Sequence, residues 1–138
     1  MSEVRGIVPV LVYEDIPAAH DFLVDAFGFE PGGVDRDGEG RAVHAEVRAG
    51  GQAIWLHRVT DEHRMGSART APSSNGLVVC VADVDAHFRR AREHGAQLDS
   101  EPRDMPYGQR EYGARDPEGH RWWFATPLAP ADDPGENG

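Results

Sequence analysis

Residues 116–122 read Asp-Pro-Glu-Gly-His-Arg-Trp, a tight turn that leads directly into an apolar strand. Proline and glycine favour a turn here, and residues 120–126 have the aromatic and β-branched composition of a strand. The turn residue Gly119 and the strand residue Trp123 have counterparts 68 positions earlier, Gly51 and Trp55. The sequence therefore predicts two related strand hairpins, one in each half of the chain.

The agreement between the halves extends beyond the hairpins. Four further pairs recur at an offset of 67 or 68: Asp15 and Asp83, His44 and Tyr112, His20 and His87, Gly28 and Gly95. The predicted elements also follow the same order in both halves, which indicates an internal duplication. The chain of 138 residues is then one domain built from two modules, each too small to be stable alone.

Each half is expected to contain one helix and several strands. The first helix begins after Asp15 and ends at Gly28, and the second begins after Asp83 and ends at Gly95. Strands are expected at 7–13, 42–48, 52–58, 77–81, 111–114 and 120–126, and the turn-rich stretch 31–40 leaves room for a short one near 30–35.

These elements give an α+β fold of two tandem βαβββ modules. The first module is expected at 4–60 and the second at 75–128, joined by a linker at 61–74, within a single domain at 1–128. Residues 129–138 have the composition of a disordered tail.

The charge and cysteine content restrict the partners and the compartment. The chain carries 14 Lys and Arg against 24 Asp and Glu, a net charge of −10, so a basic surface for nucleic acid or anionic lipid is not expected. No segment has the features of a signal peptide or a membrane span. We therefore expect a cytoplasmic protein with no nucleic-acid or membrane partner, in which the single Cys80 is a small buried residue.

Three stretches resemble a known superfamily. They are Pro-Val-Leu-Val-Tyr-Glu-Asp at 9–15, Ala-Phe-Gly-Phe at 26–29, and Tyr-Gly-Gln-Arg at 107–110 leading to the turn at 116–122. Together they are similar to the vicinal oxygen chelate superfamily, and within it to the glyoxalase/bleomycin-resistance group, over Val4 to Leu128. The resemblance implies sheets that curl around a cavity, usually completed by a symmetric homodimer.

The metal enzymes of this superfamily have four ligands, two from each module. The resemblance places those ligands at Val8, Gly76, Trp55 and Trp123. None of these side chains offers the carboxylate, imidazole or thiolate that a divalent ion requires. The sequence therefore predicts no metal and no other cofactor, which argues against glyoxalase-type isomerisation and dioxygenation.

Aromatic residues stand where the ligands would be. Because strand side chains alternate, Trp55 and Trp123 are expected to face the cavity, and Ile54, Leu56, Trp122 and Phe124 the core. Five further residues are expected to help bind a ligand: His44, Glu46, His57, Tyr112 and Tyr107. Indole rings can stack on planar molecules or hold a cation, and Glu46 could pair with a basic group. Alternatively, the tryptophans simply fill a closed core.

The resemblance and these residues predict a metal-independent protein that binds and sequesters a planar or cationic antibiotic or toxin, without catalytic residues. An enzyme remains the alternative. His44, Glu46 and His57 could form a relocated two-histidine, one-carboxylate metal site for a lyase, isomerase or oxygenase, or one histidine could act as a general base without metal.

Overall fold

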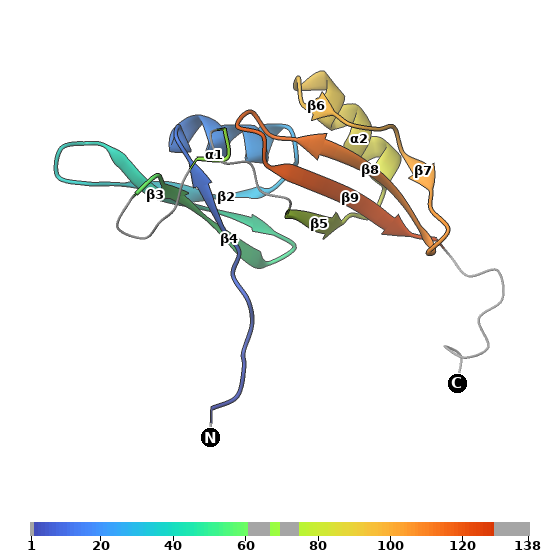
Figure 1. Ribbon diagram of the computed structural model, residues 1–138, viewed down its shortest axis with the longest axis horizontal. Coiled ribbons are helices and arrows are strands. Elements are labelled where there is room, and N and C mark those ends of the chain that lie inside the picture. Colours follow the sequence, from blue (N-terminus) through green and yellow to red (C-terminus); the bar gives the residue numbers. More distant parts are fainter. Residues whose placement is uncertain (1, 61–66, 70–74, 129–138) are drawn as a thin grey trace.

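The computed structural model describes residues 2–60, 67–69 and 75–128 and contains two helices and two sheets (Figure 1). The predicted tail at 129–138 and most of the predicted linker at 61–74 lie outside the described residues. Among the described residues, no helix is long and apolar enough to cross a membrane.

The first module forms a four-stranded sheet with one helix. Its elements are β1 (Val10–Tyr13), α1 (Ile16–Asp25), β2 (Glu30–Arg36), β3 (Ala42–Ala49) and β4 (Gln52–Arg58). The strand order is β1-β4-β3-β2, with β1 parallel to β4 and the other pairs antiparallel. The structure therefore contains the additional short strand for which the sequence left room near 30–35. This strand, β2, takes up part of the turn-rich stretch 31–40.

The second module repeats this order. Its elements are β5 (Gly76–Cys80), α2 (Val84–Glu93), β6 (Gln97–Leu98), β7 (Arg103–Asp104), β8 (Gln109–Arg115) and β9 (Arg121–Pro127). The main sheet order is β5-β9-β8-β6, and β7 also pairs with β8. The two short strands β6 and β7 stand where the first module has the single strand β2, and Pro102 lies between them without an N–H for the ladder. The α+β fold of two βαβββ-type modules is confirmed, with this one strand divided.

Both helices begin and end as the sequence predicts. The Asp15 carboxylate accepts a hydrogen bond from the Ala18 N–H, and the Asp83 carboxylate accepts one from the Ala86 N–H, both at 3.1 Å. Gly28 follows α1 with a φ of 75°, a left-handed conformation that favours glycine. Helix position in both modules is thus set by local sequence.

The helices cover one face of the sheets, and the core lies between them. In Figure 1, α1 and α2 lie on the same side of the two sheets, which leaves the opposite faces uncovered. The strand residues predicted to face the core do so: Ile54, Leu56, Trp122 and Phe124 are at most 3% exposed. The predicted alternation of β4 and β9 is confirmed.

Cys80 does not follow its prediction. It is exposed, and Val78 on the same strand is 58% exposed, because β5 is an edge strand whose alternate side chains lie on the uncovered face. The expectation of a buried cysteine was wrong. An apolar stretch of five residues predicts a strand, but it does not show whether both faces of that strand are packed against other elements.

Hydrogen bonds connect the turn at 116–119, in the second module, to the start of α1, in the first. The Glu118 carboxylate accepts hydrogen bonds from the backbone N–H groups of Glu14 and Asp15, at 2.7 and 2.8 Å, and His120 Nε2 donates to the Val12 carbonyl. Glu118 is only 3% exposed. A turn in the second module therefore fixes the start of α1 in the first.

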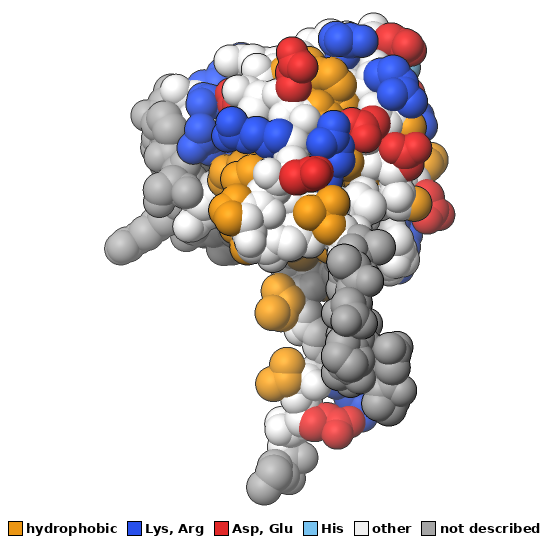
Figure 2. Space-filling model, turned by 90° about the vertical axis from the view of Figure 1, so that its right-hand side faces the viewer, with side chains coloured by type: hydrophobic (Ala, Val, Ile, Leu, Met, Phe, Trp, Pro, Cys, Tyr) orange, Lys and Arg blue, Asp and Glu red, His pale blue; other side chains and the backbone are white. Residues whose placement is uncertain are grey.

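The outer end of the second module carries charges of both signs. Figure 2 shows Arg side chains interspersed with Asp and Glu side chains over this end of the molecule. Arg110, for example, donates to both Asp85 and Asp104 at 3.1 Å. The acidic surplus of the composition does not form a uniform acidic surface here.

Candidate functional site

Both predicted tryptophans lie on the uncovered sheet faces. Trp55 on β4 is 39% exposed, and its neighbour on β1, Val10, is 40% exposed. Trp123 on β9 is half-buried beside Val78 on β5. No ring contact joins the two tryptophans within the described part of the chain. They are therefore open aromatic surfaces, one in each module, rather than the filling of a closed core.

Trp55 belongs to a fixed polar cluster. Its Nε1–H donates to Glu46 Oε1 at 3.0 Å, and Arg48 donates to the other oxygen, Glu46 Oε2, at 2.8 Å. Arg48 also donates to the Gly51 carbonyl at 2.7 Å. Both carboxylate oxygens of Glu46 are thus engaged and its charge is balanced by Arg48, which removes the argument that Glu46 attracts a cationic ligand.

The predicted histidines lie beside this cluster. His44 and His57 are directly paired across the β3–β4 hairpin, as the sequence suggested. The His44 ring lies 5.6 Å from the Trp55 ring, edge to face, and its Nδ1 is 3.3 Å from Asp35 Oδ2. His57 Nδ1 donates to the Arg58 carbonyl at 2.7 Å. The structure therefore brings four predicted residues together: His44, Glu46, Trp55 and His57.

Trp123 lies flat across its sheet. A Cβ atom on Gly76 would lie 2.5 Å from Trp123 Cζ3, and one on Gly113 would lie 3.3 Å from Trp123 Nε1. Gly76 is on β5 and Gly113 on β8, the two strands that flank β9. The indole thus spans the strand that carries it, and the glycines on either side provide the space.

The same contacts test whether a divalent metal ion, which the resemblance associates with these positions, would fit. The Trp123 ring occupies the space that a side chain at position 76 would need, and Gly76 and Trp123 hold two of the four ligand positions. The described residues contain no group of three His, Cys, Asp or Glu side chains placed to hold a metal ion. The donor set therefore does not fit a divalent ion, and His44, Glu46 and His57 do not form the relocated site of the enzymatic alternative.

Tyr112 requires a correction. It is fully buried on the helix side, where its ring packs against Phe88 and its hydroxyl lies 2.6 Å from His87 Nδ1. Burial raises the pKa of its phenol. The register explains the error: Trp55 pairs with Glu46, whereas Trp123 pairs with Gly113, so the offset between β3 and β8 is 67 rather than 68. A shift of one residue turns a strand side chain to the other face.

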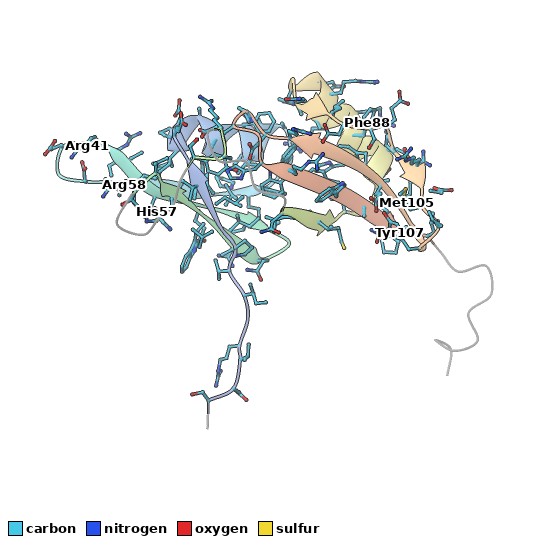
Figure 3. All side chains as sticks on the ribbon, viewed as in Figure 1. Arg41, His57, Arg58, Phe88, Met105 and Tyr107 are labelled. Carbon is cyan, nitrogen blue, oxygen red and sulfur yellow. The ribbon has the colours of Figure 1, made fainter. Side chains whose placement is uncertain are left out.

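Tyr107 lies apart from the other predicted residues. It is 62% exposed in the turn before β8, and the Glu111 carboxylate raises the pKa of its phenol, mainly by hydrogen bonding. Figure 3 shows Tyr107 and His57 at opposite ends of the molecule. Within one chain, Tyr107 therefore does not join the cluster around Trp55.

Sequence reasoning missed the charged neighbours of both tryptophans. Arg48 follows Glu46 by two positions, and Arg121 precedes Trp123 by two, so strand alternation places each pair on one face. The Arg121 guanidinium carbon lies 5.8 Å from the centre of the Trp123 ring. Alternation alone could have identified both arginines.

A groove lies between the two modules. Its volume is about 350 Å³, and it is lined by residues of the β3–β4 hairpin and of β5, with an open face toward solvent: Pro9, Ala49, Gly50, Gln52, Ile54, Leu77, Val78, Val79 and Cys80. Neither tryptophan lines this groove. The groove is therefore separate from the two tryptophan surfaces.

The fold is shared with proteins of known structure. The chain is 33% identical to TioX of Micromonospora sp. ML1, with a TM-score of 0.74, covering 91% of this chain and 100% of the other. It is 27% identical to TnmS3 of Streptomyces sp. CB03234, which is described as an antibiotic binding protein, with a TM-score of 0.69 and coverage of 92% and 98%. It is 25% identical to the bleomycin-binding protein of Streptomyces verticillus, solved with copper(II)-bleomycin, with a TM-score of 0.61 and coverage of 94% and 100%.

The family model agrees with the fold. The model of the Glyoxalase/Bleomycin resistance protein/Dioxygenase superfamily matches residues 7–124, which include both helices, both uncovered sheet faces and the turn that joins the modules. This match covers most of the 138 residues. The chain therefore belongs to the Glyoxalase/Bleomycin resistance protein/Dioxygenase superfamily.

Proposed function

We propose that this protein binds a planar aromatic small molecule, such as an antibiotic or toxin, and sequesters it without a metal and without chemical conversion. The observation that carries the proposal is the replacement of the family's metal ligands by Trp55 and Trp123, one on each uncovered sheet face. Flat indole faces suit stacking on planar rings, and each stacked pair contributes about 0.5–1.5 kcal/mol beyond simple burial.

The similarity to antibiotic-binding proteins supports the same function. TnmS3 and the bleomycin-binding protein share the fold over nearly the whole chain. Sequestration needs only a stoichiometric complex and a dissociation constant below the toxic concentration. It requires no proton transfer or bond cleavage, in keeping with a site whose Glu46 and Arg48 neutralise each other.

A second copy of the chain completes the proposed site. Trp55, Val10 and Val78 are between 39% and 58% exposed, on faces that none of the described helices and strands covers. Exposed apolar surfaces of this kind mark sites of association. In a homodimer, the open face of one chain covers that of the other, and the two aromatic surfaces become the walls of a cleft. His44 and His57 then contribute polar contacts beside Trp55.

A thermal-shift titration with bleomycin and with an anthracycline, a planar aromatic polyketide, tests the proposal. A ligand that binds the folded state raises Tm by mass action. Trp55→Phe and Trp123→Phe should each weaken binding by about two- to tenfold, the loss expected for part of one stacking contact. Phe22→Leu is the control, because this half-buried aromatic is on α1, on the helix-covered side of the sheets, and it should leave affinity unchanged. Unchanged affinity in both tryptophan variants would overturn the stacking site.

A further inference from the structure

The two tryptophans differ in whether the indole N–H has a hydrogen-bond partner. In the first module, the Trp55 N–H is bound to Glu46, and Glu46 is bound to Arg48. In the second, Trp123 Nε1 makes no hydrogen bond to any residue that the structure describes. The Trp123 surface therefore retains a free donor at its edge, whereas the Trp55 surface does not.

Two guanidinium groups stand beside Trp123, with one carboxylate between them. Arg121 on β9 pairs directly with Arg115 on β8, so both side chains lie on the uncovered face with Trp123. Arg115 Nε donates to both oxygens of Asp99, at 3.2 and 3.3 Å. Arg121 reaches the same carboxylate only at 4.0 Å. The cluster thus has one more positive than negative charge, and Arg121 is the more weakly held cation.

Arg121 also has unused hydrogen-bonding capacity. Its Nε is buried and has no hydrogen-bond partner among the described residues, and its side chain is 41% exposed. The buried Nε–H is itself closed to a ligand, but the exposed part of the guanidinium, whose terminal nitrogen is 4.0 Å from Asp99, can donate to an anionic group. The Arg121 guanidinium carbon lies over the face of the Trp123 ring, 5.8 Å from its centre, so a ligand placed on the indole would also contact the guanidinium.

On the side of Trp123 that lies away from Arg121 along the strands, the same face carries a negative charge. Glu111 on β8 lies on the same face as Gly113 and pairs with Ala125, beyond Trp123. It accepts a hydrogen bond from Gln109 at 2.9 Å. Along the strands, the Trp123 face therefore has the Arg121 and Arg115 cations on one side and the Glu111 carboxylate on the other, which favours an anionic substituent directed toward Arg121.

We propose that Trp123 and Arg121 form a subsite for an aromatic acid: the planar ring stacks on Trp123 and an attached anionic group, a carboxylate, sulfonate or phenolate, pairs with Arg121. This inference rests on the proposed function and specifies the ligand's charge. It differs from the expectation of a planar or cationic ligand, in which Glu46 was one of the arguments for a positive charge.

Isothermal titration with three probes that share one ring system tests this subsite: 2-naphthoate, 2-naphthamide and 2-naphthylmethylammonium. The intact protein should bind the naphthoate about tenfold more tightly than the amide, the difference that one charge-assisted hydrogen bond supplies, and should bind the ammonium most weakly. Added salt should weaken the naphthoate complex more than the amide complex.

Substitutions of arginine test whether Arg121 causes the preference for the naphthoate. Arg121→Gln should reduce the naphthoate affinity to that of the amide, and Arg121→Lys should preserve a preference for the acid. Arg89→Gln removes the same charge from an exposed position on α2 and should keep the full preference. Circular dichroism confirms that each variant is folded before titration.

The outcomes separate the two proposals. Equal affinity of the three probes for the intact protein, or a preference that survives in Arg121→Gln, would overturn the subsite and leave the binding of planar molecules in place. Failure of all three probes to bind at millimolar concentration, together with no Tm shift from the antibiotics, would overturn both.

Discussion

The carboxylate of Glu118 accepts a hydrogen bond from the backbone N–H of Asp15 at 2.8 Å, although the two residues are 103 positions apart in the chain. Asp15 in turn caps α1. The other Glu118 oxygen accepts the Glu14 N–H at 2.7 Å, and the adjacent Asp116 accepts the hydroxyl of Tyr13 at 2.5 Å. The turn of the second module thus supplies the acceptors that the start of the first module needs.

Glu118→Gln tests this link. The amide keeps one acceptor oxygen but turns an NH₂ group toward a backbone N–H, so one buried donor loses its partner. We expect the free energy of unfolding to fall by about 1–3 kcal/mol, measured by urea denaturation. Glu101→Gln is the control, since Glu101 is exposed, and such surface changes alter stability by less than about 0.5 kcal/mol. Equal effects of the two substitutions would contradict the role of Glu118.

Gly76→Ala tests the flat position of Trp123. The new Cβ would lie 2.5 Å from Trp123 Cζ3 and 2.8 Å from the Arg121 carbonyl oxygen, so the indole must move. We expect a loss of stability of about 1–3 kcal/mol and weaker binding of aromatic probes. Gly38→Ala, whose Cβ meets nothing within 4 Å, should change neither property. Retention of both properties in Gly76→Ala would show that the ring position is not fixed.

His87 should make stability depend on pH. Burial first, and the charge of Arg90 in addition, lower the pKa of His87 below its ordinary value of 6.5. Its neutral ring fits the site, with Nε2 donating to the Phe27 carbonyl and Nδ1 facing the Tyr112 hydroxyl. The unfolded chain binds the proton more readily, so this contribution is complete above about pH 6.5 and is lost as the pH falls through the lowered pKa.

His87→Gln measures that contribution. Urea denaturation from pH 7.5 to 5 should show a smaller decrease in the free energy of unfolding for the variant than for the intact protein. An identical decrease would show that His87 is not protonated on unfolding in this range. The variant should also be less stable at neutral pH, because the Tyr112 hydroxyl loses its partner.

Val78→Glu tests the proposed homodimer. Val78 is 58% exposed on β5, and a carboxylate there would be desolvated if a second copy covered the face. We expect sedimentation velocity to show a dimer for the intact protein and a monomer for the variant, with unchanged circular dichroism. Ala86→Glu places the same charge on the exposed side of α2 and should leave the dimer intact. A monomeric intact protein would overturn dimerisation.

Much of the fold could be predicted because local sequence controls it. Asp15 and Asp83 cap their helices through hydrogen bonds three residues away, and the alternation of Ile54 and Leu56 with Trp55 follows from strand geometry. The duplicated order of elements also indicated two similar modules, so the positions of Trp55 and Trp123 on uncovered faces were foreseeable.

The orientations that the sequence did not predict depend on strand register and on what covers each sheet face. A shift of one residue between the hairpins turned Tyr112 toward the core, and an edge position without a cover exposed Cys80. Alternation gives the two faces of a strand but not its register against a neighbour or the identity of what covers it. The sequence by itself determined the helices and the core faces, and it showed Val8, Gly76, Trp55 and Trp123 at the positions where the resemblance places metal ligands. Only the tertiary structure decided that Trp55 and Arg48 share Glu46, and that Asp99 binds Arg115 more closely than Arg121, because these pairings depend on side-chain distances between separate segments.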